Sequence, residues 1–219
     1  LVVMGALQII ALCAFAAVPA IAGRQQTTVA GLSALFDGVR MLRTEKSLVS
    51  ILGVTALVNF FFFSSTPLIQ VVGGKFNVGP AFLGLLAGML GVGMFGGALA
   101  VARYQPERRG LVYVGGSYAA FAFMVGFALA PWYAASAVSL AAAAVGMGLF
   151  GSTQAVLVMD SVSDDRRGRA LGLLSSAIGV LPLGMLALGE LAELLGTSSA
   201  IMVSVTVGAA LITLFLCFR

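Results

Sequence analysis

Two side-chain amides lie inside long apolar runs of this 219-residue chain. Asn59 stands midway along the run 48–72, and Gln154 stands toward the polar end of the run 134–159. An amide that faces hydrocarbon loses its hydrogen bonds, so each should face either a cavity, where it could bind a solute, or another helix. For Asn59 both interpretations stay open, and for Gln154 we favour the contact with another helix. Both residues are candidates for a substrate cavity.

The densest polar stretch is residues 160–172, Asp-Ser-Val-Ser-Asp-Asp-Arg-Arg-Gly-Arg-Ala-Leu-Gly. Its order of charges suits a helix start, because Ser163 can cap the helix and two acids then follow at its positive end. Asp165 and Arg169 also have the spacing of a helical ion pair, with the acid first. The stretch is therefore either a capped helix start or a charge latch whose ion pairs break as the protein moves. The candidate latch residues are Asp160, Asp165, Arg166, Arg167 and Arg169.

Residue types that usually perform catalysis are scarce. The chain has no histidine, and its two cysteines, Cys13 and Cys217, both lie within apolar runs, where they act as small hydrophobic residues. No apolar run carries a charge near its centre, and no glycine-rich phosphate-binding loop is present. We therefore expect no catalytic residue, no metal site, no cofactor and no enzymatic activity. The net charge of +4 comes from residues between the apolar runs and does not predict nucleic-acid binding.

The composition predicts that membrane-spanning elements position these residues. Hydrophobic residues make up 60% of the chain and charged residues 9%, whereas a soluble domain has about 45–50% and about 25%. A helical span needs about 20 mainly apolar residues. Seven runs are long enough: 1–22, 48–72, 80–102, 111–130, 134–159, 170–189 and 199–218. Their hydrophobicity is continuous and does not alternate as in barrel strands, so we expect an all-α integral membrane bundle.

Basic residues are distributed unevenly between the loops. Eleven of the twelve lie in the alternate loops 23–47, 103–110 and 160–169 and at the end of the chain. The opposite side has only Lys75, a turn with Trp132, and a predicted loop that contains Glu190 and Glu193. Because basic loops stay in the cytoplasm, this pattern predicts that the three basic loops and the C-terminus are cytoplasmic.

The longest connection, 23–47, has its own periodicity. Apolar residues recur at helical spacing, and polar residues take the other face; the apolar set is Leu32, Leu35, Phe36, Val39 and Leu42. This pattern predicts an amphipathic helix that lies along the cytoplasmic interface, and a solvated linker is the alternative. The predicted order is one span, this linker helix and then six spans.

Small residues and a proline mark places where helices can approach closely or bend. Gly84 and Gly88 form one G-x-x-x-G pair, and Gly93 and Gly97 form another, within the run 80–102. Pro182 lies within the run 170–189, where it removes a backbone hydrogen bond. These five residues are candidates for helix packing or for a hinge, and the two roles are compatible.

Three segments together resemble a known family. They are Phe36-Asp37-Gly38-Val39-Arg40, Leu83-Gly84-Leu85-Leu86 followed by Gly91-Val92-Gly93, and Ser163 to Gly172. In order and spacing they resemble the C-terminal half of a bacterial major facilitator superfamily transporter, nearest to the drug and siderophore exporters. Two features depart from that pattern. Loop 103–110 lacks the Asp-x-x-Gly-Arg core of the superfamily's signature loop, and Gly179-x-x-Pro182-x-Gly184 is only a loose echo of the antiporter motif.

The resemblance implies a domain organisation and a function. Residues 1–22 would be the last helix of an N-terminal half, 23–47 the cytoplasmic linker, and 48–219 the C-terminal six-helix bundle. The protein would be a secondary transporter in the bacterial inner membrane that exports a small hydrophobic or amphipathic compound by alternating access. Its partners would be the bilayer, the N-terminal six-helix half and the substrate. The alternative is a membrane scaffold or truncated remnant that does not transport.

Overall fold

A computed structural model describes residues 41–42 and 44–218, all within the unit Gly38–Arg219. The expected span 1–22 and all but the last few residues of the expected linker 23–47 therefore lie outside the described residues. The described part is helical throughout and contains no strand, as expected from the continuous hydrophobic runs. Its elements are α3 (Lys46–Phe61), η1 (Phe63–Ser65), α4 (Leu68–Gly74), α5 (Pro80–Tyr104), α6 (Arg109–Leu129), α7 (Tyr133–Asp160), η2 (Asp164–Arg166), α8 (Arg167–Ile178), α9 (Leu181–Leu195) and α10 (Thr197–Cys217).

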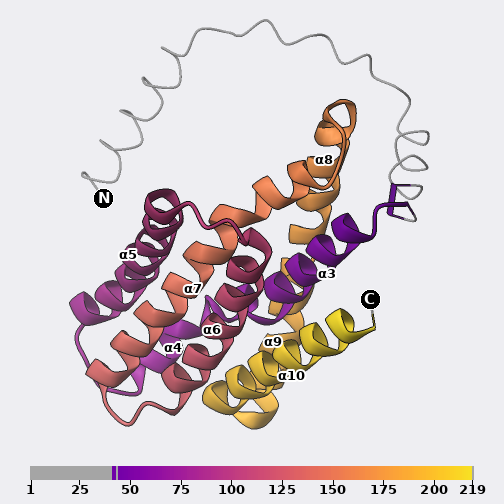
Figure 1. The fold of residues 1–219 in the computed structure, drawn as a ribbon. Helices are drawn as coiled ribbons and strands as arrows, with labels where there is room; N and C mark the ends of the chain where they lie inside the picture. The colour runs from indigo at the N-terminus through magenta and orange to yellow at the C-terminus, as the bar shows by residue number, and fades with distance from the viewer. Residues whose placement is uncertain (1–40, 43, 219) are drawn as a thin grey trace, which may run out of the picture. The chain divides into compact units, whose positions relative to one another are not determined.

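These elements form six helical segments that are long and apolar enough to cross a membrane. They correspond to the six runs expected after the linker, so this part of the prediction is confirmed. Two of the six segments are built from more than one helix: α3, η1 and α4 form the first, and η2, α8 and α9 form the fifth. Figure 1 shows these breaks in the indigo and orange parts of the chain.

Helix α7 packs against both α5 and α6 (Figure 1). Glycine allows the close approach on both sides. A methyl group at Gly93 would stand 2.5 Å from the Ala141 carbonyl oxygen, and one at Gly97 would collide with the Val145 carbonyl. On the α6 side, a methyl group at Gly116 would stand 2.6 Å from the Gly146 carbonyl. Close backbone contact replaces the hydrophobic drive that helices lack in lipid.

The other glycine pair on α5 has a different environment. A methyl group at Gly84 or Gly88 would meet nothing within 4 Å, and both residues are exposed in the described bundle. The structure thus brings Gly93 and Gly97 against a neighbouring helix but leaves Gly84 and Gly88 on an open face. A hinge role for any of the four stays a prediction.

Pro67 interrupts the first span. It has no N–H to offer the carbonyl of Phe63, and its ring crowds that carbonyl. The Phe63 carbonyl instead accepts the Thr66 backbone N–H at 3.1 Å and the Thr66 hydroxyl at 2.7 Å. The chain tightens into the 3₁₀ turn η1 and resumes as α4. Ser64, in the same turn, has a buried hydroxyl with no hydrogen-bond partner among the described residues.

Pro182 marks the break in the fifth span. Helix α8 ends at Ile178 and α9 begins at Leu181, with Pro182 in the first turn of α9. Because proline has no N–H, it cannot bond to the carbonyl one turn earlier in a continuing helix. A proline is therefore better accommodated in the first turn of a new helix than inside an existing one. The break brings Gly184 against the backbone of Phe60, where a methyl group would collide with the Phe60 carbonyl.

The prediction that Glu190 and Glu193 lie in a loop is wrong. Both residues lie on α9, which continues to Leu195 and ends at Gly196, where φ is +81°. Their side chains are exposed. The two acids lower the local hydropathy, which ends the apolar run. The helix continues past that point, because a helix that leaves the hydrocarbon core keeps its backbone hydrogen bonds as it crosses the interface.

Candidate functional site

Three polar side chains from three helices meet inside the bundle; we call Thr55, Tyr113 and Gln154 the polar cluster. The Gln154 amide of α7 donates to the Thr55 hydroxyl of α3 at 2.9 Å. That hydroxyl lies 2.8 Å from the phenol oxygen of Tyr113 on α6. The Tyr113 hydroxyl donates to the backbone carbonyl of Ile51 at 2.8 Å. The favoured interpretation of Gln154, a contact with another helix, agrees with this geometry.

The hydrogen bonds of the polar cluster run in one direction. A carbonyl can only accept, so the single hydroxyl proton of Tyr113 is used on Ile51. Thr55 must then donate its own proton to the Tyr113 oxygen, and Gln154 must donate to Thr55. Only one assignment of donors and acceptors therefore satisfies all three side chains. The cluster therefore fixes α3, α6 and α7 in one register.

Asn59 lies one turn beyond the polar cluster on α3. Its side-chain amide donates to the Thr55 carbonyl of its own helix at 2.9 Å, and the residue is only 5% exposed. This hydrogen bond stays within α3, and the Asn59 side chain is buried in the described bundle. A substrate contact by Asn59 stays a prediction.

Packing closes the polar cluster to lipid and water. Thr55, Tyr113 and Gln154 are all buried. The Tyr113 ring stacks on Phe150 of α7, with ring centroids 4.8 Å apart and an interplanar angle of 20°. Tyr113 is four residues from the start of α6, or about 6 Å along its axis. The cluster therefore lies inside the end of the bundle where Arg109 begins α6.

An apolar cavity of about 130 Å³ lies beside the break in the first span. It is lined by residues from η1 and the flanks of the break, together with residues of α5, α6 and α7: Phe62, Phe63, Thr66, Ile69, Leu90, Met94, Met124 and Met147. Phenylalanine rings and flexible methionine thioethers suit apolar guests of varied shape. A dry cavity of similar size, about 150 Å³, can hold benzene.

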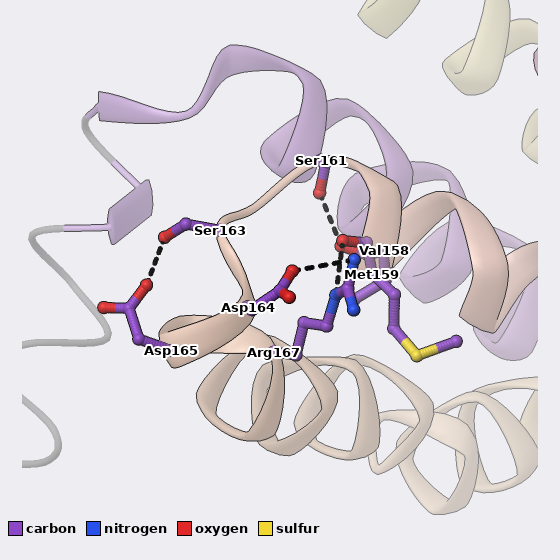
Figure 2. Close-up of polar contacts among 7 residues, drawn as sticks. All are labelled: Val158, Met159, Ser161, Ser163, Asp164, Asp165 and Arg167. Carbon is purple, nitrogen blue, oxygen red and sulfur yellow. Dashed lines mark hydrogen bonds and ion pairs between the residues drawn. The ribbon is translucent and has the colours of Figure 1, made fainter.

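The stretch 160–172 contains the end of α7, the link through η2 and the first half of α8. Arg167 holds it together: its Nη2 lies 3.0 Å from Asp164 Oδ1, and its Nε donates to the Met159 carbonyl at 3.4 Å. Figure 2 shows Arg167 reaching back to the end of α7 while Asp165 points the other way. Ser163 takes the cap position of η2, but its hydroxyl donates to Asp165 Oδ1 at 2.5 Å and its oxygen accepts no backbone N–H, so the predicted side-chain cap is not formed.

The latch candidates are spread over this link. Asp160 ends α7 and pairs with Arg109, whose Nη1 lies 3.2 Å from Asp160 Oδ2. Asp165 and Arg166 lie in η2, where Arg166 Nε is 3.8 Å from the Asp165 carboxylate. Arg167 and Arg169 are on α8. The side chains of these two pairs are half exposed or more, so each pair contributes little stability. Their role as a latch stays a prediction.

Residues 1–182 match the Major Facilitator Superfamily. The chain belongs to this family. Its members are transporters and not enzymes, which agrees with the expected lack of enzymatic activity. No curated protein matches the chain. The match does not distinguish between the halves or subgroups of the superfamily.

For this superfamily member, sequence reasoning missed three residues that the structure places in polar contacts. Thr55 and Tyr113 were overlooked because threonine can bond within its own helix and tyrosine is common near membrane interfaces. Arg109 was counted only as a loop charge. A signal existed for Tyr113: it stands inside an apolar run one turn past the basic loop, so its hydroxyl needs a buried partner. Its partners could not be read from the chain, since Thr55 is 58 residues away.

Proposed function

We propose that the chain is the C-terminal part of a secondary transporter that exports a small hydrophobic or amphipathic compound by alternating access. In this proposal residues 1–22 end an N-terminal half, 23–47 form the linker, and 48–219 form the C-terminal bundle. The observation that carries the substrate class is the cavity beside η1, because its phenylalanine and methionine lining favours an apolar group about the size of benzene.

Two breaks in the helices support a mechanism that involves bending. The first span breaks at η1 and the fifth at Gly179–Val180, and Gly184 sits against Phe60 where the two broken segments meet. Broken helices at membrane depth are typical of segments that line a binding site in transporters. We propose that the substrate cavity opens and closes as these segments bend, with Pro182 as the hinge.

The placement of the charges supports the proposed orientation. The ion pair of Arg109 and Asp160 and the link around Arg167 lie at one end of the bundle, whereas Lys75 bonds to Ser198 at the other, at 2.6 Å. Since basic residues favour the cytoplasm, we assign the arginine-rich end and the C-terminus to the cytoplasmic side of a bacterial inner membrane.

The substrate class is tested with accumulation assays in intact cells. Cells that express the complete transporter and cells that lack it are loaded with a panel of fluorescent compounds that differ in apolar size and charge. We expect lower accumulation of hydrophobic and amphipathic compounds in expressing cells, and no difference for small polar solutes. Equal accumulation of every compound in expressing and non-expressing cells would contradict the proposed function.

A pair of variants tests the cavity itself. Leu90→Phe adds a ring to the cavity lining, whereas Leu214→Phe makes the same change at an exposed position on α10. We expect Leu90→Phe to reduce export of the largest compounds most, with membrane insertion unchanged, and Leu214→Phe to behave like the parent. If both variants export all compounds normally, the cavity is not the substrate site.

A membrane scaffold that does not transport is the competing function. It predicts no difference in accumulation for any compound and no effect of the Leu90→Phe variant, so the same two assays decide between the proposals.

A further inference from the structure

Thr55 holds two side-chain amides at once. Its backbone carbonyl accepts a hydrogen bond from Asn59 Nδ2, and its hydroxyl accepts one from Gln154 Nε2, both at 2.9 Å. A carbonyl can only accept, so the nitrogen end of Asn59 must face it. The Thr55 hydroxyl gives its own proton to Tyr113, so it can only accept from Gln154. Neither amide can turn over without losing its hydrogen bond to Thr55.

This arrangement leaves the oxygen ends of both amides unused. Asn59 Oδ1 and Gln154 Oε1 receive no hydrogen bond from any residue that the structure describes. In that part of the chain, the fully buried side-chain atoms without a partner are the Ser64 and Ser136 hydroxyls, so both amide oxygens keep some accessible surface. The two residues are otherwise buried, at 5% and 9% exposed. Both oxygens are therefore open to a donor that the described bundle does not supply.

Two amide oxygens without donors favour one kind of polar group. The oxygen is the negative end of the amide dipole, so a pair of them attracts a positive charge. Each oxygen can also accept N–H or O–H donors on its lone pairs. A protonated amine supplies a charge and N–H donors together, whereas a quaternary ammonium supplies the charge alone. The apolar runs carry no charge near their centres, so no side chain of the runs themselves supplies that positive group.

We propose that Asn59 Oδ1 and Gln154 Oε1 bind the protonated amine of an amphipathic solute, and that Thr55 positions both oxygens without touching the ligand. This inference rests on the proposed function, because it names the polar group of the transported compound. Asn59 precedes Phe62, which lines the cavity beside η1, by less than one helical turn. One molecule can therefore place its amine on the amides and its apolar group in the cavity.

Ligand binding by the complete transporter in lipid nanodiscs tests the proposal without a transport step. Two probes share one apolar fluorophore and one linker, and they differ only in a terminal primary ammonium or trimethylammonium group. Both therefore carry one positive charge at neutral pH. Fluorescence anisotropy gives the Kd of each probe, and empty nanodiscs correct for partition into lipid. We expect the parent to bind the ammonium probe about tenfold more tightly, the low end for a hydrogen bond from a charged donor.

Thr55→Val and Thr55→Ser test the positioning role. Valine keeps the shape of the side chain but gives Gln154 no acceptor, so that amide is free to turn and the preference should fall to about threefold or less. Serine keeps the hydroxyl, so the preference should stay at about tenfold. The ratio of the two Kd values cancels any loss of folded protein.

Thr153→Val is the matched control for Thr55→Val. It makes the same change next to Gln154, at a buried threonine whose hydroxyl bonds only within α7, at 2.9 Å and 3.1 Å. This variant should keep the preference of the parent, because it leaves the acceptor of Gln154 in place.

Asn59→Ser tests the amide oxygen itself. A serine hydroxyl in a helix can bond to the carbonyl four residues earlier, as Ser117 does to Tyr113 at 2.9 Å, so the Thr55 carbonyl keeps a partner. Because the amide oxygen is lost, binding of the ammonium probe should weaken by about three- to tenfold, while binding of the trimethylammonium probe changes little. A purely structural role of Asn59 would weaken both probes equally.

Equal affinity of the parent for the two probes would overturn the proposal, as would a failure to bind either of them. Tighter binding of the trimethylammonium probe would place the cation on aromatic rings and would overturn it as well. An unchanged preference in Thr55→Val would show that Thr55 does not position the amides. None of these results bears on export of neutral hydrophobic compounds, so the accumulation assay decides the proposed function separately.

Discussion

Ser204 of α10 donates its hydroxyl to the carbonyl of Phe61 on α3, 3.0 Å away and 143 residues earlier in the chain. This carbonyl does not receive the N–H of Ser65, which bonds to Phe62 at 2.9 Å, one residue short of the helical pattern, and the Ser65 hydroxyl reaches it only at 3.5 Å. Nothing in lipid can replace a lost backbone hydrogen bond, so a break in a spanning helix needs a donor from a neighbour. Ser204 is the donor from another helix and makes the shorter of the two hydroxyl bonds, so it ties α10 to the break in the first span.

Ser204→Ala should destabilise the bundle by about 0.6–1.7 kcal/mol, the range measured for side-chain hydrogen bonds between membrane helices. The control is Ser176→Ala, since the Ser176 hydroxyl bonds only within its own helix, at 3.2 Å, and is exposed. Unfolding by a denaturing detergent, followed by helicity, measures both. Equal stability of the two variants would mean that the Phe61 carbonyl finds another donor.

Gly184→Ala and Gly189→Ala are a matched pair on α9. A methyl group at Gly184 would collide with the Phe60 carbonyl, whereas one at Gly189 would meet nothing within 4 Å. We expect Gly184→Ala to cost about 1–3 kcal/mol through overpacking and Gly189→Ala to be neutral or slightly stabilising. Thermal unfolding in detergent compares them. If Gly184→Ala is as stable as the parent, the two broken segments are not in close contact.

Thr55→Val removes the centre of the polar cluster while keeping its shape. The Gln154 amide and the Tyr113 oxygen would both lose a partner in a buried site, so we expect a loss of about 1–3 kcal/mol. Adding Gln154→Leu should then cost little more, because its partner is already gone. A double-mutant cycle measured by detergent unfolding gives the coupling energy. Additive losses would show that the two residues do not act together.

Exchanging the charges of Arg109 and Asp160 tests the proposed latch. The pair is about half exposed, so either single reversal should change stability by less than about 1 kcal/mol. If the pair closes the cytoplasmic side, each single reversal should slow transport several-fold, and the double exchange Arg109→Asp with Asp160→Arg should restore it. Transport assays with insertion controls measure both effects. Full activity of the single reversals would leave the pair without a role in gating.

Neutralising Arg166 and Arg169 together tests the rest of the latch. Neither change should alter membrane insertion, because other basic residues remain in the same loops. We expect slower transport from the double variant if the link between α7 and α8 opens and closes during the cycle. Transport at the parent rate would leave 160–172 as a helix start and a topology signal alone.

The six spans of the described bundle follow from the sequence because each depends on a local property, a run of apolar residues as long as the bilayer is thick. The ends of the runs were less reliable. At Glu190 and Glu193 the hydropathy falls before the helix ends, since a helix needs its backbone bonds as much in the interface as in the core.

The polar cluster could not be predicted in full, because its members lie far apart in the chain. Gln154 and Asn59 were recognised as amides in apolar runs, yet Thr55, which bonds to both, carries no unusual signal in a helix. Proline is a better local signal. Both breaks occur next to Pro67 and Pro182, but the contact of Gly184 with Phe60 depends on how two distant segments pack.

Helix α7 has 28 residues and α10 has 21. At 1.5 Å per residue they are about 42 Å and about 32 Å long, and the hydrocarbon core is about 30 Å thick. Helix α7 is therefore longer than the hydrocarbon core is thick, whereas α10 nearly equals it. A thicker membrane would match α7 better and α10 less well, so we expect the balance between conformations to shift with the acyl-chain length of the surrounding lipids.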